Sequence, residues 1–173
     1  MTPAPIPGNE SERLRALHEL LVLDTPPDEK FDRVVRFAAE QMDVPIALVS
    51  LIDAQRQWFK ARVGLDVPET ARDVSFCSHA ILEPDIFVVE DASRDQRFAD
   101  NPLVLAGPRI RFYAGAPLSA PGGERIGTLC VIDDKPRKLG LVEIAVLEAL
   151  RDLVNDTLAG KPDEDDTDNR DAT

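Results

Sequence analysis

Two apolar segments joined by a glycine-rich turn, residues 110–118 and 125–133, place the strongest constraint on how this chain folds. Alternate side chains of a strand point to opposite faces, and here both faces carry apolar residues. Pro121-Gly122-Gly123 between the segments is typical of a hairpin loop, because proline fixes one φ angle and glycine tolerates positive φ. We therefore expect a central hairpin in a sheet that is covered on both sides. Small residues are expected to leave room for a cavity beside it: Ala114, Gly115, Ala116, Gly127 and Thr128.

The charge balance and the cysteine content limit the partners and the location of the chain. Its 173 residues carry a formal net charge of −12, which disfavours nucleic acid and anionic membranes as partners because both are negatively charged. Cys77 and Cys130 are the only cysteines and lie far apart, which fits a reducing cytoplasm better than a secreted, disulfide-linked domain. The sequence shows neither a signal peptide nor an apolar run long enough to span a bilayer. A cytoplasmic protein is therefore expected.

Three regions are expected along the chain. Residues 1–8 contain three prolines and no apolar pattern, which predicts a disordered N-terminus. Residues 9–159 are expected to form a single domain. Residues 160–173 are acidic and polar, which predicts a disordered tail.

Helical spacing of apolar residues predicts two helices before the first strand. Asn9 is expected to cap the first helix, and Thr25 the second, in which Pro26 would occupy the first helical position. A continuous apolar run over residues 45–53 predicts a strand buried on both faces, and residues 57–63 predict a second strand.

The elements around the hairpin complete the expected order. Residues 64–72 are expected to form a loop, residues 75–81 a short helix or tight turn, and residues 86–90 a brief strand. Residues 91–108 predict a long irregular segment, with room for one helical turn, of the kind that is usually functional. The apolar residues of a last helix over 139–158 cover about half of its circumference, so this helix is expected to cover the first helix, pair with a second subunit, or both. This order of elements predicts an α+β fold with an antiparallel sheet.

Six segments between residues 23 and 137 form a recognisable series: LDTPPDEKFDRVVRFAAEQMDVPIALVSLID, RQWFKARVGL, RDVSFCSHAI, RFADNPLV, IRFYAGAPL and IGTLCVIDDKPR. In this order they resemble the bacterial GAF domain family, specifically a subfamily found with histidine kinases and diguanylate cyclases. The resemblance implies a central six-stranded antiparallel sheet flanked by helices, with the N- and C-terminal helices packed together on one face. It also implies a ligand pocket on the other face, under a lid formed by residues 86–109, and a homodimer through the terminal helices.

Cys77-Ser78-His79 is the most reactive-looking tripeptide of the sequence. An imidazole near a thiol could lower the pKa of the thiol and make a nucleophile or redox sensor. Alternatively, Cys77 is a buried thiol and His79 completes a hydrogen-bond network. In bilin-carrying relatives the attachment site reads Cys-His directly, so the intervening Ser78 argues against a chromophore. Together with Cys130 these residues could be zinc ligands, but the sequence has no Cys-x-x-Cys pair and no metal is expected.

Several other residues are candidates for the wall of a ligand pocket. Polar residues of the long loop could bind a polar ligand, although Asp and Asn also start turns and cap helices. Aromatic residues could line the pocket or belong to the core, and Arg111 could hold an anion or lie in solvent. The cyclic-nucleotide motif of some GAF relatives is not found. The candidate pocket residues are Trp58, Cys77, His79, Asp91, Asp100, Asn101, Arg111, Tyr113, Thr128 and Cys130.

No set of residues forms a catalytic motif such as a phosphate-binding Gly-rich loop or a nucleophile elbow. The leading expectation is a non-catalytic sensory module that binds an unidentified small molecule, uses no identified cofactor and signals in trans. Its candidate partners are components of a histidine kinase or diguanylate cyclase pathway. One alternative is a thiol-based redox sensor or reductase using Cys77, because free-methionine-sulfoxide reductases are GAF enzymes. The other is a dimerisation scaffold with no ligand.

Overall fold

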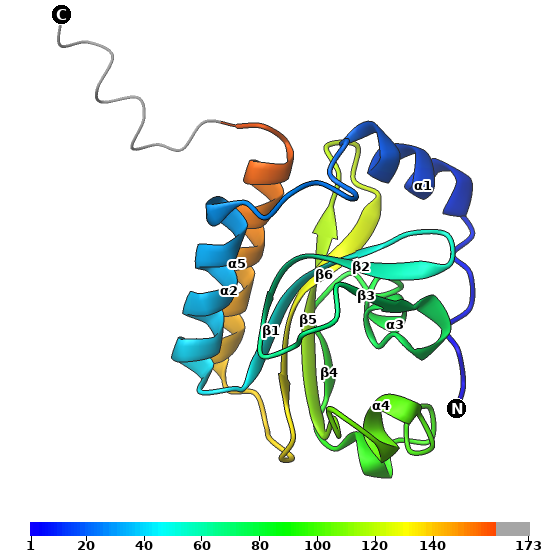
Figure 1. The fold of residues 1–173 in the computed structure, drawn as a ribbon, viewed down its shortest axis with the longest axis vertical. Coiled ribbons are helices and arrows are strands. Elements are labelled where there is room, and N and C mark those ends of the chain that lie inside the picture. The colour runs from blue at the N-terminus through cyan, green and yellow to red at the C-terminus, as the bar shows by residue number, and fades with distance from the viewer. Residues whose placement is uncertain (162–173) are drawn as a thin grey trace, which may run out of the picture.

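The computed structural model describes residues 1–161; most of the predicted acidic tail, residues 162–173, lies outside the described residues. Six strands form one antiparallel sheet in the order β3-β2-β1-β6-β5-β4 (Figure 1). The α+β class and the six-stranded sheet are therefore confirmed. The strands are β1 (Ile46–Ile52), β2 (Arg56–Val63), β3 (Glu69–Ala71), β4 (Phe87–Val89), β5 (Phe112–Ser119) and β6 (Arg125–Asp133).

Two long helices cover one face of the sheet. Helices α2 (Glu29–Met42) and α5 (Leu141–Leu158) lie side by side against it, while α1 (Glu10–Glu19) lies apart from them, near one end of β6 (Figure 1). The C-terminal helix α5 thus packs with α2, whereas the N-terminal helix α1, which was expected on the same face, lies apart. The opposite face is covered by the short helices α3 (Cys77–Ala80) and α4 (Pro102–Leu105) and their connecting segments.

The hairpin of β5 and β6 is buried on both faces, as predicted. Phe112 and Leu129 belong to the core on the side of α2 and α5, whereas Tyr113 and Cys130 belong to a second core on the opposite side. Ile126 is an exception to strict alternation, because the register shifts between Leu118 and Ser119 and places Ile126 in the helix-side core. The sheet therefore divides the molecule into two separately packed halves.

Some local predictions were wrong. Asp28, and not Thr25, caps α2, with its carboxylate accepting from the N–H of Lys30 at 2.9 Å. The Thr25 hydroxyl instead donates to the carbonyl of Val22 at 2.5 Å and accepts from the ammonium of Lys60 at 2.7 Å. Asn9 does occupy the N-cap position of α1, as predicted, but its side chain makes no capping hydrogen bond.

Two segments contain more regular structure than was expected. The predicted loop over residues 64–72 contains the edge strand β3, which pairs with β2. The long segment over residues 91–108 contains the short 3-10 turn Ala92–Arg94 and helix α4. All three elements are too short to leave a periodic pattern in the sequence, so only the surrounding structure reveals them.

The first residues of the chain contact the body of the domain. The backbone N–H of Thr2 donates to the carbonyl of Arg97 at 3.1 Å, and the carbonyl of Thr2 lies 3.0 Å from Nε2 of His79. The prediction of a disordered segment over residues 1–8 did not anticipate these contacts.

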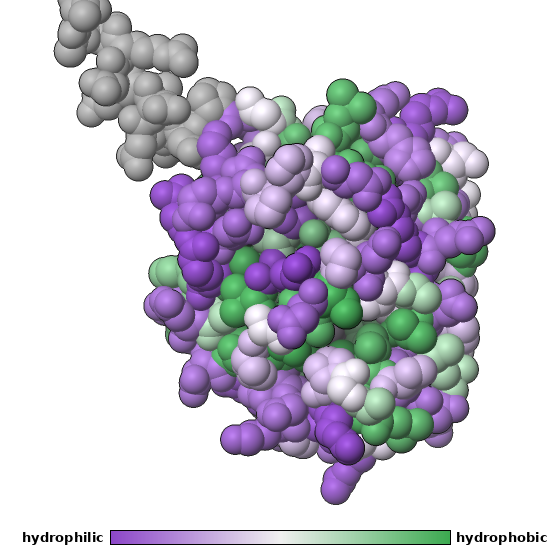
Figure 2. All heavy atoms as spheres, in the orientation of Figure 1, coloured by the Kyte–Doolittle hydropathy of each residue, from purple (hydrophilic) through white to green (hydrophobic). Residues whose placement is uncertain are grey.

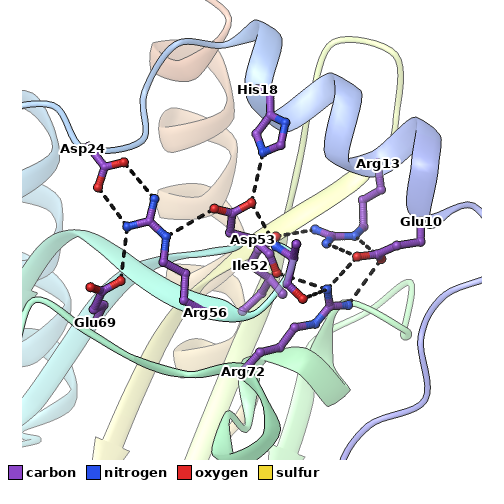
Figure 3. Close-up of polar contacts among 10 residues, drawn as sticks. Glu10, Arg13, His18, Asp24, Ile52, Asp53, Arg56, Glu69 and Arg72 are labelled. Atoms are coloured by element: carbon purple, nitrogen blue, oxygen red, sulfur yellow. Dashed lines mark hydrogen bonds and ion pairs between the residues drawn. The ribbon is translucent and has the colours of Figure 1, made fainter.

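Helix α1 is held in place by one carboxylate shared between two buried arginines (Figure 3). Glu10 accepts from Nε and Nη2 of Arg13 at 2.9 Å each and from Nη1 of Arg72 at 2.5 Å. Arg13, which is only 1% exposed, also donates to the carbonyl of Ile52 at 2.7 Å. Arg72 donates further to the carbonyl of Asp53 at 3.0 Å. These bonds tie α1 to the end of β1 and to the segment that precedes α3.

A second polar network lies beside the first (Figure 3). Arg56 donates to both carboxylate oxygens of Asp24 at 2.8 Å, to Asp53 at 3.2 Å and to Glu69 at 3.1 Å. His18 of α1 lies 3.0 Å from the same Asp53. The hairpin between β1 and β2 is therefore linked to α1, to the segment before α2 and to β3.

Within residues 1–161, none of the helices combines the length and the apolar composition that a bilayer crossing requires.

A substitution at Gly127 tests how closely strands β1 and β6 approach each other. A Cβ atom at this position would lie 2.0 Å from the carbonyl oxygen of Ser50 in β1, a backbone atom that cannot move away alone. We expect Gly127→Ala to lower the free energy of unfolding by about 2–3 kcal/mol in urea denaturation. Gly8→Ala is the control, since nothing lies within 4 Å of its added Cβ, and it should change stability by less than about 0.5 kcal/mol. Equal stability of the two variants would contradict this packing.

The carboxylate of Glu10 should make the stability of the domain depend on pH. Burial by itself raises the pKa of Glu10, but the hydrogen bonds and charges of Arg13 and Arg72 outweigh it and lower the pKa from 4.5 to about 2. The resulting stabilisation is present above pH 4.5 and is lost as the pH falls towards 2. We expect Glu10→Gln to lose about 1–2 kcal/mol at neutral pH and to converge with the unmodified protein near pH 2.

Urea denaturation at a series of pH values measures this difference. Glu12→Gln provides a matched control, because Glu12 is an exposed residue of the same helix. A constant difference between Glu10→Gln and the unmodified protein from pH 7 to about pH 2 would show that the carboxylate does not act through its charge.

Candidate functional site

A cavity of about 440 Å³ lies on the face of the sheet opposite α2 and α5. This volume is within the range that small-molecule sites usually have. Its floor is apolar, because the strands present their inward side chains there. The floor residues are Ile46, Leu48, Phe59, Tyr113 and Ile132.

Two connecting segments form the walls of the cavity. The predicted lid, residues 86–109, contributes Leu103, Gly107 and Pro108. The opposite wall comes from residues 64–70, which the sequence had suggested only as a loop. In the same orientation as Figure 1, Figure 2 shows apolar side chains gathered in the middle of a mostly hydrophilic surface. Leu65 and Val67, which line the cavity, are half-buried and exposed, respectively.

A small polar group built on Gln57 interrupts the apolar wall. The amide oxygen of Gln57 accepts from the hydroxyls of Ser50 at 2.9 Å and Ser75 at 3.0 Å, and its amide nitrogen donates to Thr70 at 2.9 Å. Gln57 and Thr70 both line the cavity. This group joins β1, β2, β3 and the segment before α3, so it fixes the relative positions of the elements that enclose the cavity.

Cys77 lies at the start of α3, and several hydrogen-bonding groups surround its sulfur. The hydroxyls of Tyr113 and Thr128 each donate to it at 3.1 Å, and the thiol of Cys130 lies 3.9 Å away. Burial raises the pKa of Cys77, but the hydrogen bonds from Cys130, Thr128 and Tyr113 outweigh it and lower the pKa to about 7. The arrangement therefore stabilises negative charge on this sulfur.

The neighbours of Cys77 keep their protons. Burial, together with the hydrogen bond and negative charge of Cys77, raises the pKa of Cys130 well above its usual range. Burial and the charges of the two sulfurs likewise raise the pKa of Tyr113. Both residues can thus act as donors to Cys77. Both cysteines are free and buried.

The small residues of the hairpin do not open the cavity, contrary to the expectation. A Cβ atom on Gly115 would lie 2.3 Å from the hydroxyl of Tyr113, because the tyrosine ring lies over this glycine. None of the small hairpin residues contributes to the cavity lining. The space above Gly115 is therefore filled by Tyr113, and the cavity is formed elsewhere, between the strands and the two connecting segments.

The structure places only part of the candidate pocket residues at the cavity. Cys77 and Tyr113 line it, and Thr128 and Cys130 lie directly behind Cys77. Trp58 lies on the opposite face of the sheet, in the core under α2 and α5.

The polar candidates of the long loop have local structural contacts. Asp91 accepts from the N–H of Ser93, and Asn101 caps α4 and donates to the carbonyl of Val74 at 3.0 Å. Asp100 is 66% exposed beside the N-terminal amine, and Arg111 donates to the carbonyls of Val104 and Ile110. None of these four residues lines the cavity.

His79 does not contact Cys77 as a catalytic base would. Its Nε2 lies 3.0 Å from the carbonyl of Thr2, and its ring packs edge-on against Phe98. Burial lowers the pKa of His79, although the carbonyl of Thr2 acts in the opposite direction. In the part of the chain that the structure describes, no three His, Cys, Asp or Glu side chains are grouped so as to hold a metal ion.

Sequence reasoning missed the polar group of Ser50, Gln57 and Ser75. A signal was available for Ser50, because it interrupts the apolar run of β1 on the side of Leu48 and Ile52. A polar residue at an inward position of a buried strand requires a partner. The identity of that partner could not be read from the sequence, since Gln57 and Ser75 come from other elements.

Comparisons with known proteins give the chain a family and a named relative. The sequence profile described as GAF domain matches residues 26–158. A cyclic di-GMP phosphodiesterase of Pseudomonas aeruginosa is 46% identical over 155 residues, which are 89% of this chain and 26% of that protein. The chain thus spans about a quarter of the length of this relative.

Solved structures share the fold at low sequence identity. The GAF domain of an Acinetobacter phosphoenolpyruvate-protein phosphotransferase has a TM-score of 0.62 and 19% identity, with 86% of this chain and 94% of that chain covered. A type II free methionine-R-sulfoxide reductase from Thermoplasma acidophilum has a TM-score of 0.62 and 18% identity, with 76% and 92% covered. At these identities the likeness shows the fold alone.

The named relative overturns the functional expectation. A non-catalytic, stand-alone sensory module signalling in trans was expected, yet the protein that matches most of the chain is named as an enzyme. The same finding overturns the two alternatives, a thiol-based redox protein using Cys77 and a scaffold without ligand. The resemblance of the six segments is confirmed, because the family profile covers most of the chain. This protein belongs to the GAF domain family.

Proposed function

We propose that this chain is the GAF domain that regulates a cyclic di-GMP phosphodiesterase. The observation that carries the proposal is the 46% identity to a protein with this name, maintained over 89% of the chain. In this proposal, a small molecule bound in the cavity controls the hydrolysis of cyclic di-GMP.

The contacts around the cavity support a route by which a ligand could act. Cys77 of α3 lines the cavity, and the next residue, Ser78, donates its hydroxyl to the carbonyl of Arg72 at 3.2 Å. Arg72 in turn is bonded to Glu10 of α1. A shift of α3 on ligand binding would therefore disturb the buried contacts that hold α1. A ligand regulates only if it binds two such arrangements with different affinity.

Deletion of the coding sequence in the source organism tests the proposal. Cellular cyclic di-GMP, measured by mass spectrometry, should change at least about twofold and return to normal when the unmodified protein is restored. Leu103→Trp, which places a larger side chain at the cavity wall, should fail to restore the normal level. Leu105→Trp is the matched control, because Leu105 lies in the same helix, is 62% exposed and does not line the cavity. A level of cyclic di-GMP unaffected by the deletion would refute the proposal.

We further propose that the domain forms a homodimer through α5. Along one side of this helix, exposed or half-buried apolar side chains recur at alternating spacings of four and three residues, the pattern of a helix that pairs with another helix. Phe37 of α2, 46% exposed, lies on the neighbouring helix. The residues at this spacing are Val142, Val146, Ala149 and Leu153, of which Val142 is 78% and Leu153 45% exposed.

Charged substitutions on α5 test the dimer. The double variant Val142→Glu, Leu153→Glu should shift the mass measured by light scattering from that of a dimer to that of a monomer, because it buries two charges at the interface. Leu105→Glu, at a similarly exposed leucine of α4, should leave the mass unchanged. A monomeric mass for the unmodified protein at micromolar concentration would contradict the dimer.

A further inference from the structure

The cavity has a negative electrostatic character. The lining contains the carboxylates of Asp66 and Glu69 and the thiol of Cys77, while Tyr113 keeps its proton, and within residues 1–161 the lining includes no Lys, Arg or His. Asp66 is exposed at the rim, and Glu69 shares the guanidinium of Arg56 with Asp24 and Asp53, so these carboxylates outnumber the one cation beside them. The charge of −12 on the whole chain acts in the same direction. A negatively charged molecule would therefore be repelled at the entrance and would meet no cationic side chain inside.

The polar groups inside the cavity are already engaged with one another. The sulfur of Cys77 is surrounded by Tyr113, Thr128 and Cys130. Gln57 accepts from two serine hydroxyls and donates to Thr70. The remaining inner surface is aliphatic and aromatic. Because a buried charge is costly without a partner of opposite charge, a phosphate group has nothing here to compensate its lost hydration.

We propose that this cavity binds an uncharged, largely apolar small molecule and excludes cyclic di-GMP. Every cyclic dinucleotide carries a negative charge on each phosphodiester. The acidic rim would repel this charge, and the apolar floor offers it no partner. This inference rests on the proposed regulation of a phosphodiesterase, and it specifies the chemical class of the regulating ligand. The domain responds to a molecule chemically unlike the substrate of the enzyme, and neither substrate nor product acts through the cavity.

Two fluorescent probes with the same ring skeleton provide the test. N-phenylnaphthylamine is uncharged, whereas anilinonaphthalene sulfonate adds one sulfonate, and both become brighter in an apolar site. Titration of the full chain should show that the uncharged probe binds at least about tenfold tighter than the sulfonate. Cyclic di-GMP should not displace the uncharged probe.

Substitutions at the cavity show whether the probe binds there. Leu103→Trp and Val67→Trp each enlarge a residue of the lining, from opposite walls, and should weaken binding of the uncharged probe about tenfold. Leu105→Trp should leave the binding unchanged, because this residue lies in the same helix outside the lining. Two blocking variants are used because either one alone could disturb the fold.

Reversing a charge at the rim tests the electrostatic cause. Asp66→Lys should raise the affinity for the sulfonate about threefold, while Glu148→Lys, an exposed position of α5 on the other face of the sheet, should not. Equal affinities for the two probes, or displacement by cyclic di-GMP at micromolar concentration, would overturn the inference while leaving the proposed regulation intact. Undiminished binding in both blocking variants would overturn the cavity as the site.

Discussion

The burial of β1, β5 and β6 on both faces is the constraint on which the rest of this structure depends. Because these strands have no solvent-facing side, each must present an apolar side chain at nearly every position. One set packs under α2 and α5, and the other forms the core and the cavity floor on the opposite side. The close approach of Gly127 to the carbonyl of Ser50 keeps these strands in register. The ligand-sized cavity and the helices α2 and α5 are thus separated by a single, tightly packed layer.

Buried polar groups connect α1 to the elements that enclose the cavity. Glu10 is shared by Arg13 and Arg72, and the carbonyl of Arg72 receives the hydroxyl of Ser78, next to Cys77 in the cavity lining. Removing one member would leave a buried charge without its partner, which is costly. Movement of α3 is therefore coupled to α1 through the hydrogen bonds of Arg72 to Ser78 and Glu10. In the proposed function, this coupling is the route by which a bound molecule would act on the phosphodiesterase.

The sequence predicted the larger elements well and the site only in part. The hairpin, the buried strand β1 and the amphipathic helices α2 and α5 carry clear periodic patterns, so their existence and approximate bounds were predicted correctly. The strand β3 and the wall over residues 64–70 carry no such pattern and were missed. Candidates chosen for their chemistry, such as Asp91 and Arg111, proved to bond to nearby backbone groups. Polar residues in loops form hydrogen bonds to nearby backbone groups more often than they contact a ligand.

The sequence by itself determined the fold class, the family and the acidic character of the chain, because these depend on periodicity, segment order and composition. Only the tertiary structure decided which residues of distant segments are in contact. It placed Tyr113 over Gly115, where a cavity was expected, and brought Cys77 under the hydroxyls of Tyr113 and Thr128. It also joined Glu10 to Arg72 across 62 residues of chain. Such contacts join residues of distant segments, and their geometry is set by packing, which local sequence patterns do not encode.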